Sequence, residues 1–172
     1  QVLALSPKLK EMFQRFNVHY HLQSAFYETP DHSVVGMHTD EAVYAPLYYG
    51  YGGEGQYAER AAYARAVEQT IMSIAPDTVH VLVKASPEVI TRRMKENPHK
   101  NAVLQEKDIG YVLARFQEEY ERSTLANKLS IDTSNATVEE TLAQFVREIE
   151  PHLTETDRLR ILTHRALARL QT

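Results

Sequence analysis

The sequence contains no cysteine. Without cysteine, the chain can form neither a disulfide framework nor a cysteine-based zinc site, as expected of a protein in a reducing, cytoplasmic compartment. The net charge of -4 at pH 7 lacks the overall basic character of a nucleic-acid-binding protein. No apolar run approaches the length of a membrane span, and no signal peptide is visible. We therefore expect neither a nucleic acid nor a membrane as a partner.

The composition is that of a single globular domain. Of the 172 residues, 43% are hydrophobic and 24% are charged, which is enough to build one core. The chain begins with Gln1 rather than Met, which leaves room for a preceding segment.

A stretch near the middle of the chain predicts a buried strand followed by a capped helix. Residues 79–83 are mostly valine and leucine, which favours a strand covered on both faces. Ser86 can accept a hydrogen bond from a free N–H of the next helix, and Pro87 suits the first helical position. Arg92 and Arg93 follow beside a loop rich in Lys, His and Asn, an arrangement suited to binding phosphate.

Apolar periodicity predicts helices and strands in alternation. The expected helices cover 6–27 (of which 19–27 is read as either helix or extended chain, with helix preferred), 57–75, 109–120, 137–149 and 154–170; further strands are expected at 33–38 and 129–132. The apolar residues expected to be buried include Leu9, Met12, Phe13, Phe16, Phe116, Leu142, Phe145, Val146 and Ile149.

This alternation predicts an α/β fold, a three-layer parallel sheet with helices on both faces. We expect one domain over 1–172, with a C-terminal helix at 154–172. The apolar stripe of that helix can pack on the body or on a second copy. Three clear strands are few for such a fold, so we expect an N-terminal strand, or two, to lie outside this sequence.

Two acidic residues follow the strand expected at 33–38. Asp40 and Glu41 come where the strand ends, and ligands of α/β proteins usually bind at this edge. The plain alternative is that both residues cap the following helix and interact with its positive end.

Several tyrosines lie just beyond the acidic pair. Residues 47–55 are rich in glycine, which predicts a flexible loop. Tyrosine rings there can stack on a substrate, or simply pack at the edge of the loop. The tyrosines of this region are Tyr44, Tyr48, Tyr49 and Tyr51.

In layout, residues 33–149 resemble the P-loop nucleotide and nucleoside kinases, thymidylate kinase in particular. The segment from Val34 to Glu41 is similar to the end of that family's third strand, which carries an Asp-Arg-Tyr type motif on the acceptor side. Asp40 matches the Asp of the motif, whereas Glu41 replaces its Arg. The stretch from Pro76 to Met94 is similar to the fourth strand and the helix that leads into the lid.

The resemblance implies an ATP-dependent phosphotransferase that uses Mg²⁺ and acts on a nucleotide, nucleoside or other small acceptor. The roles that it implies are catalysis by Asp40, Glu41, Arg92 and Arg93, substrate binding by His38, Tyr44, Tyr48 and Tyr49, and ATP binding beside adenine by Ser134, Asn135 and Ala136. Proteins of that family are often dimers, so a homodimer is a further expectation.

The defining G-x-x-x-x-G-K-[ST] loop is missing from this sequence. That loop holds phosphate and Mg²⁺, and the glycines of 47–55 lack its Gly-Lys-Ser/Thr ending. Either the phosphate loop precedes Gln1, which we prefer, or the chain is a related nucleotide-binding or regulatory module without kinase activity.

Histidines support a third hypothesis. His19 and His21, with His32, His38 and Asp40, fall in a short span, and such spacings allow a metal site that activates water. The zincin spacing H-E-x-x-H is absent, which makes a metallohydrolase the least favoured of the three.

Overall fold

The structure is a computed structural model that describes residues 4–28, 33–100 and 102–170. Helices make up 64% of it. The α-helices are α1 (Pro7–Tyr20), α2 (Ser24–Tyr27), α3 (Met37–Tyr44), α4 (Arg60–Ile74), α5 (Pro87–Glu96), α6 (Ile109–Arg122), α7 (Val138–Ile149) and α8 (Glu155–Arg169). Short π- or 3-10-helical turns are η2 (Ala45–Tyr49), η3 (Glu106–Asp108) and η4 (Glu150–His152).

Two strands, β1 (Val79–Lys84) and β2 (Asn127–Asp132), form a parallel pair. Their register runs from Val79 opposite Asn127 to Lys84 opposite Asp132. Within the described residues these are the only strands, and the chain is mostly helical. The predicted three-layer parallel sheet of a P-loop kinase is therefore wrong for this structure.

The strand expected at 33–38 is not formed. Gly36 and Met37 both have positive φ, 82° and 56°, which turns the chain out of the extended conformation. Helix α3 begins at Met37 immediately afterwards. Val34 and Val35, the β-branched residues that suggested a strand, are exposed, so no packing holds them in a sheet.

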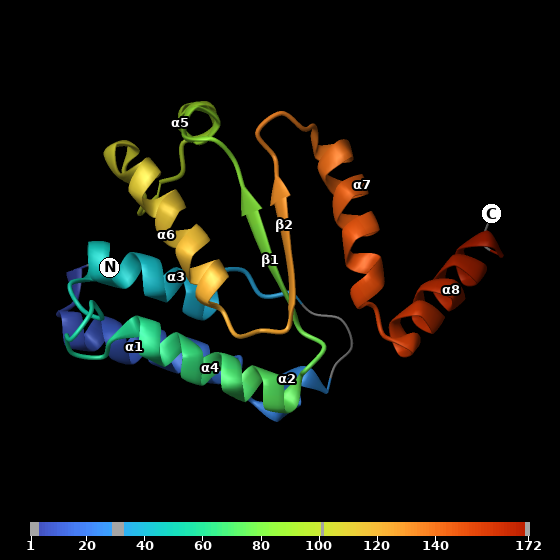
Figure 1. The fold of residues 1–172 in the computed structure, drawn as a ribbon, viewed down its shortest axis with the longest axis horizontal. Helices are drawn as coiled ribbons and strands as arrows, with labels where there is room; N and C mark the ends of the chain where they lie inside the picture. Colours follow the sequence, from blue (N-terminus) through green and yellow to red (C-terminus); the bar gives the residue numbers. More distant parts are fainter. Residues whose placement is uncertain (1–3, 29–32, 101, 171–172) are drawn as a thin grey trace.

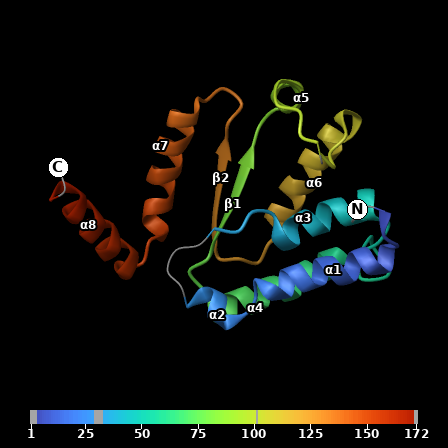
Figure 2. The same ribbon diagram turned by 180° about the vertical axis from the view of Figure 1, so that it is seen from behind.

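The helices lie on both sides of the strands (Figures 1 and 2). Helix α3 packs against α1, α4 and α6, while α6 contacts β1 and α7 contacts β2. The main apolar cluster consists of Val18 from α1, Val67 and Ile71 from α4, and Leu125 from the segment between α6 and β2. Val18 is the residue that α1 contributes to this cluster.

Helix α1 buries a different face from the one predicted. Ser6 caps the helix as the sequence predicts, because its hydroxyl oxygen accepts a hydrogen bond from the Leu9 N–H. The apolar side of the helix is largely exposed, and its buried residues are instead Lys10, Glu11 and Val18. The exposed apolar residues are Leu9, Met12, Phe13 and Phe16, at 46 to 68% exposure.

Helices α7 and α8 begin as predicted, each with a capping box. Thr137 pairs with Glu140, and Thr154 pairs with Asp157. The apolar side of α7 is only half covered, since Leu142 is exposed while Phe145 is partly buried. Helix α8 extends away from the other helices (Figures 1 and 2), and its apolar stripe is not packed on the body.

Two local predictions also need correction. The segment 19–27 is not one continued helix, because α1 ends at Tyr20 and α2 begins at Ser24 after a turn. The segment 47–55 is not wholly a loop, because η2 continues α3 to Tyr49. The turn predicted at 28–32 lies largely outside the described residues.

Candidate functional site

A cleft of about 420 Å³ lies between α1 and α3. The coil before α3 and the η2 turn complete its walls. This volume is in the usual range for a small-molecule site. Its polar lining residues are Gln14 and Asn17 from α1, His21 just after α1, Asp40, Glu41 and Tyr44 from α3, and Tyr49 from η2. Four residues predicted for the site, Asp40, Glu41, Tyr44 and Tyr49, thus meet in one cleft.

Of the two carboxylates in this cleft, Asp40 is the one that the described residues leave unpaired. No described residue forms a hydrogen bond or ion pair with it. Burial raises the pKa of Asp40, and the nearby His38 opposes this increase only in part. A carboxyl group with a raised pKa in a cleft is a candidate acid or base.

Gly36 makes room for the Asp40 side chain. A Cβ atom at position 36 would lie 2.2 Å from Oδ2 of Asp40, far inside van der Waals contact. The φ of Gly36, 82°, is also one that glycine adopts most easily. The sharp turn before α3 therefore sets the position of the Asp40 carboxylate.

Glu41 is turned toward a buried polar cluster rather than left free. Its Oε2 accepts a hydrogen bond of 2.9 Å from the Tyr51 hydroxyl and lies 3.7 Å from Nε of Arg60. Burial raises the pKa of Glu41, although Tyr51 and Arg60 act to lower it. Burial, together with the charge of Glu41, also raises the pKa of Tyr51. Glu41 therefore supports the wall of the cleft from behind.

Arg60 occupies the centre of this cluster and is completely buried. Its Nη2 donates to Oε1 of Glu11 at 2.6 Å, and its guanidinium lies 4.9 Å and 4.7 Å from the ring centres of Tyr51 and Tyr63. Its Nη1 has no hydrogen-bond partner among the described residues. This pairing explains why α1 buries Glu11 and leaves its apolar stripe exposed, since an unpaired buried arginine is costly.

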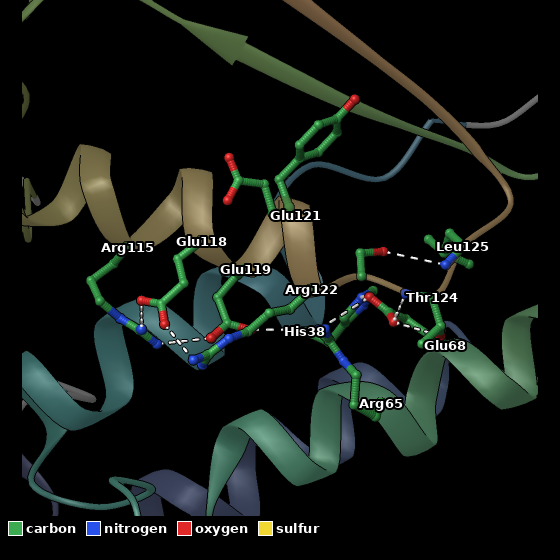
Figure 3. Close-up of polar contacts among 12 residues, drawn as sticks. His38, Arg65, Glu68, Arg115, Glu118, Glu119, Glu121, Arg122, Thr124 and Leu125 are labelled. Atoms are coloured by element: carbon green, nitrogen blue, oxygen red, sulfur yellow. Dashed lines mark hydrogen bonds and ion pairs between the residues drawn. The ribbon is translucent and has the colours of Figure 1, made fainter.

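His38, predicted to bind substrate, points into the protein. Its Nε2 lies 3.4 Å from Oε1 of Glu68 on α4, and both residues are buried (Figure 3). Glu68 also accepts hydrogen bonds from the backbone and hydroxyl of Thr124. Burial acts to raise the pKa of Glu68, but the hydrogen bonds from His38 and Thr124 lower it to about 2. His38 therefore ties α3 to α4 and to the end of α6.

The tyrosines divide between the cleft and the neighbouring helix. The Tyr44 ring stacks on Tyr48 at 6.0 Å and meets Phe116 edge-on at 5.5 Å. Burial and the charge of Asp40 raise the pKa of Tyr44 to about 12. The Tyr48 hydroxyl donates to Asp108 at 2.9 Å, which directs it toward α6 and away from the cleft. Tyr44 and Tyr49 remain as the aromatic part of the cleft.

The residues predicted to bind nucleotide lie elsewhere. Arg93 on α5 donates two hydrogen bonds of 2.8 Å to the hydroxyl and carbonyl of Thr133. Ser134 donates to Asp132 and accepts from the Ser86 N–H at 2.9 Å. These contacts join α5 to the β2–α7 connection at the carboxyl ends of the strands (Figure 1), a part of the molecule away from α1.

The remaining members of this group are more exposed. Arg92 forms a loose ion pair, 3.9 Å, with Glu96 and borders an open groove of about 680 Å³ along α5. All residues of that groove come from this one helix, so it is a surface feature rather than a built site. Asn135 is exposed and Ala136 partly buried in the connection before α7. The structure thus brings Arg93 near Ser134, but brings neither near Asp40.

The histidines do not gather as a metal site in the described part of the chain, which contains no group of three or more potential His, Cys, Asp or Glu ligands. Nδ1 of His21 bonds to the Asn17 carbonyl at 2.8 Å, and His38 faces Glu68. His32, a member of the predicted set, lies outside the described residues.

Comparison of the chain with protein-family models, curated proteins and solved structures yields no match. The candidate site therefore depends on its own geometry. A search of the described helices finds none with the length and apolarity needed to cross a membrane.

Several residues of the site were not foreseen from the sequence. Gln14 and Asn17 line the cleft, and Glu11 and Arg60 support it from behind. His21, which the sequence suggested only as a metal ligand, also lines the cleft. Glu11 and Arg60 are 49 positions apart on helices that both look amphipathic. No local pattern marks such a buried pair, because charged residues on a helix usually face solvent.

Proposed function

We propose that the cleft between α1 and α3 binds a small hydroxyl-bearing acceptor and prepares it to receive the γ-phosphoryl group of ATP. The observation that carries this proposal is Asp40, a carboxylate with a raised pKa and no hydrogen-bond or ion-pair partner among the described residues, in a cleft of small-molecule size. The choice of reaction comes from the sequence resemblance to small-molecule kinases alone, because the described residues do not form the fold that the resemblance implied.

In this proposal, Asp40 accepts a hydrogen bond from the attacking hydroxyl group. It takes the hydroxyl proton, as a general base does, while the oxygen bonds to the γ-phosphorus and the bond from that phosphorus to the β-phosphate oxygen breaks, which releases ADP. Gly36 holds the carboxylate in place. Tyr44 and Tyr49 pack against the body of the acceptor and limit the access of water.

The described residues fit ATP only in part. Asn135 and Ala136 can lie against a planar ring. Arg93 and Ser134, however, already donate hydrogen bonds to Thr133 and Asp132. We therefore assign no described residue to the triphosphate. Mg²⁺ usually binds through phosphate oxygens with only one or two carboxylates, so it would arrive with the nucleotide.

The test is phosphorylation of an acceptor, followed by mass spectrometry. The protein is incubated with Mg·ATP and a panel of nucleosides, sugars and amino alcohols. Asp40→Asn should lower the rate by about 10²- to 10⁴-fold, the range for losing a general base. Asp77→Asn, the same change at an exposed turn outside the cleft, should leave the rate unchanged. Absence of any phosphorylated product, or equal rates for both variants, would reject the proposal.

A second candidate is a binding module that does not catalyse phosphoryl transfer. The observation that favours it is the separation of Arg92 and Arg93 from the Asp40 cleft. This module would bind the same acceptors with the same dependence on Asp40, yet consume no ATP. The phosphorylation assay and a binding titration together distinguish the two.

A further inference from the structure

The charge of the residues that line the cleft indicates which acceptors it can bind. Its described lining residues include two carboxylates, the unpaired Asp40 and Glu41, which faces Arg60 behind the wall, and no lysine or arginine. Phosphate groups are usually bound by Arg, Lys or a series of backbone N–H groups. A phosphorylated acceptor would therefore meet negative charge in this cleft without a cation to bind it.

The cations near the cleft are already engaged. Arg60 is buried behind Glu41 and bonds to Glu11, and Arg15 pairs with the same Glu11. The Lys10 ammonium donates to the Tyr49 carbonyl at 3.5 Å and is almost fully buried. Releasing Arg60 or Lys10 for a ligand would take a donor from the buried Glu11 carboxylate or from the Tyr49 carbonyl, which is costly.

The polar groups of the lining are rich in acceptors. Asp40 offers a carboxylate, and Gln14 and Asn17 offer amides that can both donate and accept. In a neutral His21 ring, Nδ1 donates to the Asn17 carbonyl, so Nε2 is left as an acceptor. Hydroxyl and ammonium groups of a ligand would complement this set.

We propose that the acceptor is an unphosphorylated, donor-rich hydroxyl compound, neutral or positively charged, such as an amino alcohol or an amino sugar. This inference rests on the proposed function where it treats the ligand as a phosphoryl acceptor. It concerns binding, however, and can be tested without ATP. It also departs from the nucleotide acceptors that the sequence resemblance suggested.

The experiment is calorimetric titration at pH 8, well above the usual pKa of histidine. Two matched series are used: glucosamine, glucose and glucose 6-phosphate, and thymidine and thymidine 5′-monophosphate. In any series that binds, the unphosphorylated members should bind at least tenfold more tightly than the phosphorylated one. Tighter binding of a phosphorylated member would overturn the inference, and so would failure of both series to bind.

A charge variant tests whether the charge of the lining causes the preference for unphosphorylated ligands. Gln14→Lys adds a cation to the lining, and should reduce the preference against phosphate at least tenfold, whichever series binds. Gln144→Lys makes the same substitution on α7, where the new ammonium can still pair with Glu148, and should change nothing. Equal effects of the two variants, or no effect of Gln14→Lys, would show that the lining charge does not select the acceptor.

These outcomes separate the inference from the proposed function. Preferential binding of unphosphorylated compounds without phosphoryl transfer would reject the kinase proposal and keep the inference. Phosphoryl transfer to an acceptor that already carries phosphate would keep the kinase proposal and reject the inference.

Discussion

At the scale of single residues, Gly36 leaves the space in which the Asp40 carboxylate lies. Its φ of 82° disfavours any side chain, and a Cβ atom would meet Oδ2 of Asp40 at 2.2 Å. Gly55 has a similar φ, 66°, but a Cβ atom there would have no neighbour within 4 Å. Alanine substitutions at the two glycines therefore distinguish the cost of backbone strain, expected at both, from the cost of a clash with Asp40, expected only at Gly36.

We predict that Gly36→Ala lowers the free energy of unfolding by about 2 kcal/mol or more, since strain and clash add. Gly55→Ala should cost only the strain, about 1 kcal/mol. Urea unfolding of the two variants measures the difference. Equal losses would mean that Asp40 does not lie against Gly36. Gly36→Ala should also weaken acceptor binding, because it displaces the Asp40 carboxylate, whereas Gly55→Ala should not.

At the scale of elements, the buried polar contacts join α3, α4 and α6. Glu68 of α4 bonds to His38 of α3 and to Thr124 beyond α6, while Arg65 of α4 lies 3.3 Å from Glu68 and 3.4 Å from Glu119 of α6 (Figure 3). These contacts link the helix that carries Asp40 to the rest of the molecule.

We predict that the contribution of Glu68 to stability falls in acid. Its pKa is about 2 in the folded protein, below its ordinary value of 4.5. Its stabilising effect is therefore complete above pH 4.5 and is lost as the pH falls toward 2. Glu68→Gln should cost up to about 3 kcal/mol at pH 7 and much less near pH 2.5.

The measurement is urea unfolding of wild type and Glu68→Gln at both pH values. Taking their difference at each pH removes the effect of other titrating groups. Glu121→Gln, on the exposed side of α6, is the matched control and should cost little at either pH. A Glu68→Gln cost that stays constant with pH would contradict the proposed pKa.

Local signals in the sequence predicted the elements better than their packing. Ser86, Thr137 and Thr154 cap helices as expected, and both strands form where valine, leucine and isoleucine predicted them. The apolar stripe of α1 was misread because the Glu11–Arg60 pair depends on a helix far along the chain. The missing strand at 33–38 depends on a positive φ at Met37, which no sequence pattern announces.

Part of the lining of the candidate cleft was named from the sequence. Asp40, Tyr44 and Tyr49 do share a cleft, although the reason for expecting them together, the edge of a parallel sheet, does not apply. The α1 wall of the cleft arises from packing between helices, which short-range periodicity cannot specify. Arg92 and Arg93 were placed correctly at the end of a helix, but that helix lies away from the cleft.

At the scale of the whole molecule, much apolar surface remains uncovered. On α8, Leu159, Leu162 and Leu170 are 66, 61 and 83% exposed, and they recur at helical spacing along one side. Exposed apolar surface of this kind usually marks an interface. The homodimer expected from the resemblance remains a prediction that this surface supports.

We predict that the protein dimerises through α8. Light scattering after size exclusion should give twice the mass of 19.7 kDa, and a Leu159→Asp, Leu162→Asp double variant should give the monomer mass. His164→Asp, an exposed position on the opposite side of α8, is the control and should leave the dimer intact. A monomeric wild type at high micromolar concentration would contradict the prediction.

If the cleft between α1 and α3 is the binding site of this protein, a bound acceptor should change the surroundings of the residues that line it. Backbone amide NMR during titration with the tightest-binding unphosphorylated acceptor measures this change. We expect the largest shift changes at Gln14, Asn17, Asp40 and Tyr49, and their loss in Asp40→Asn. Shift changes confined to α5 and the β2–α7 connection, with none on α1 or α3, would place the site at the strand ends and contradict the account.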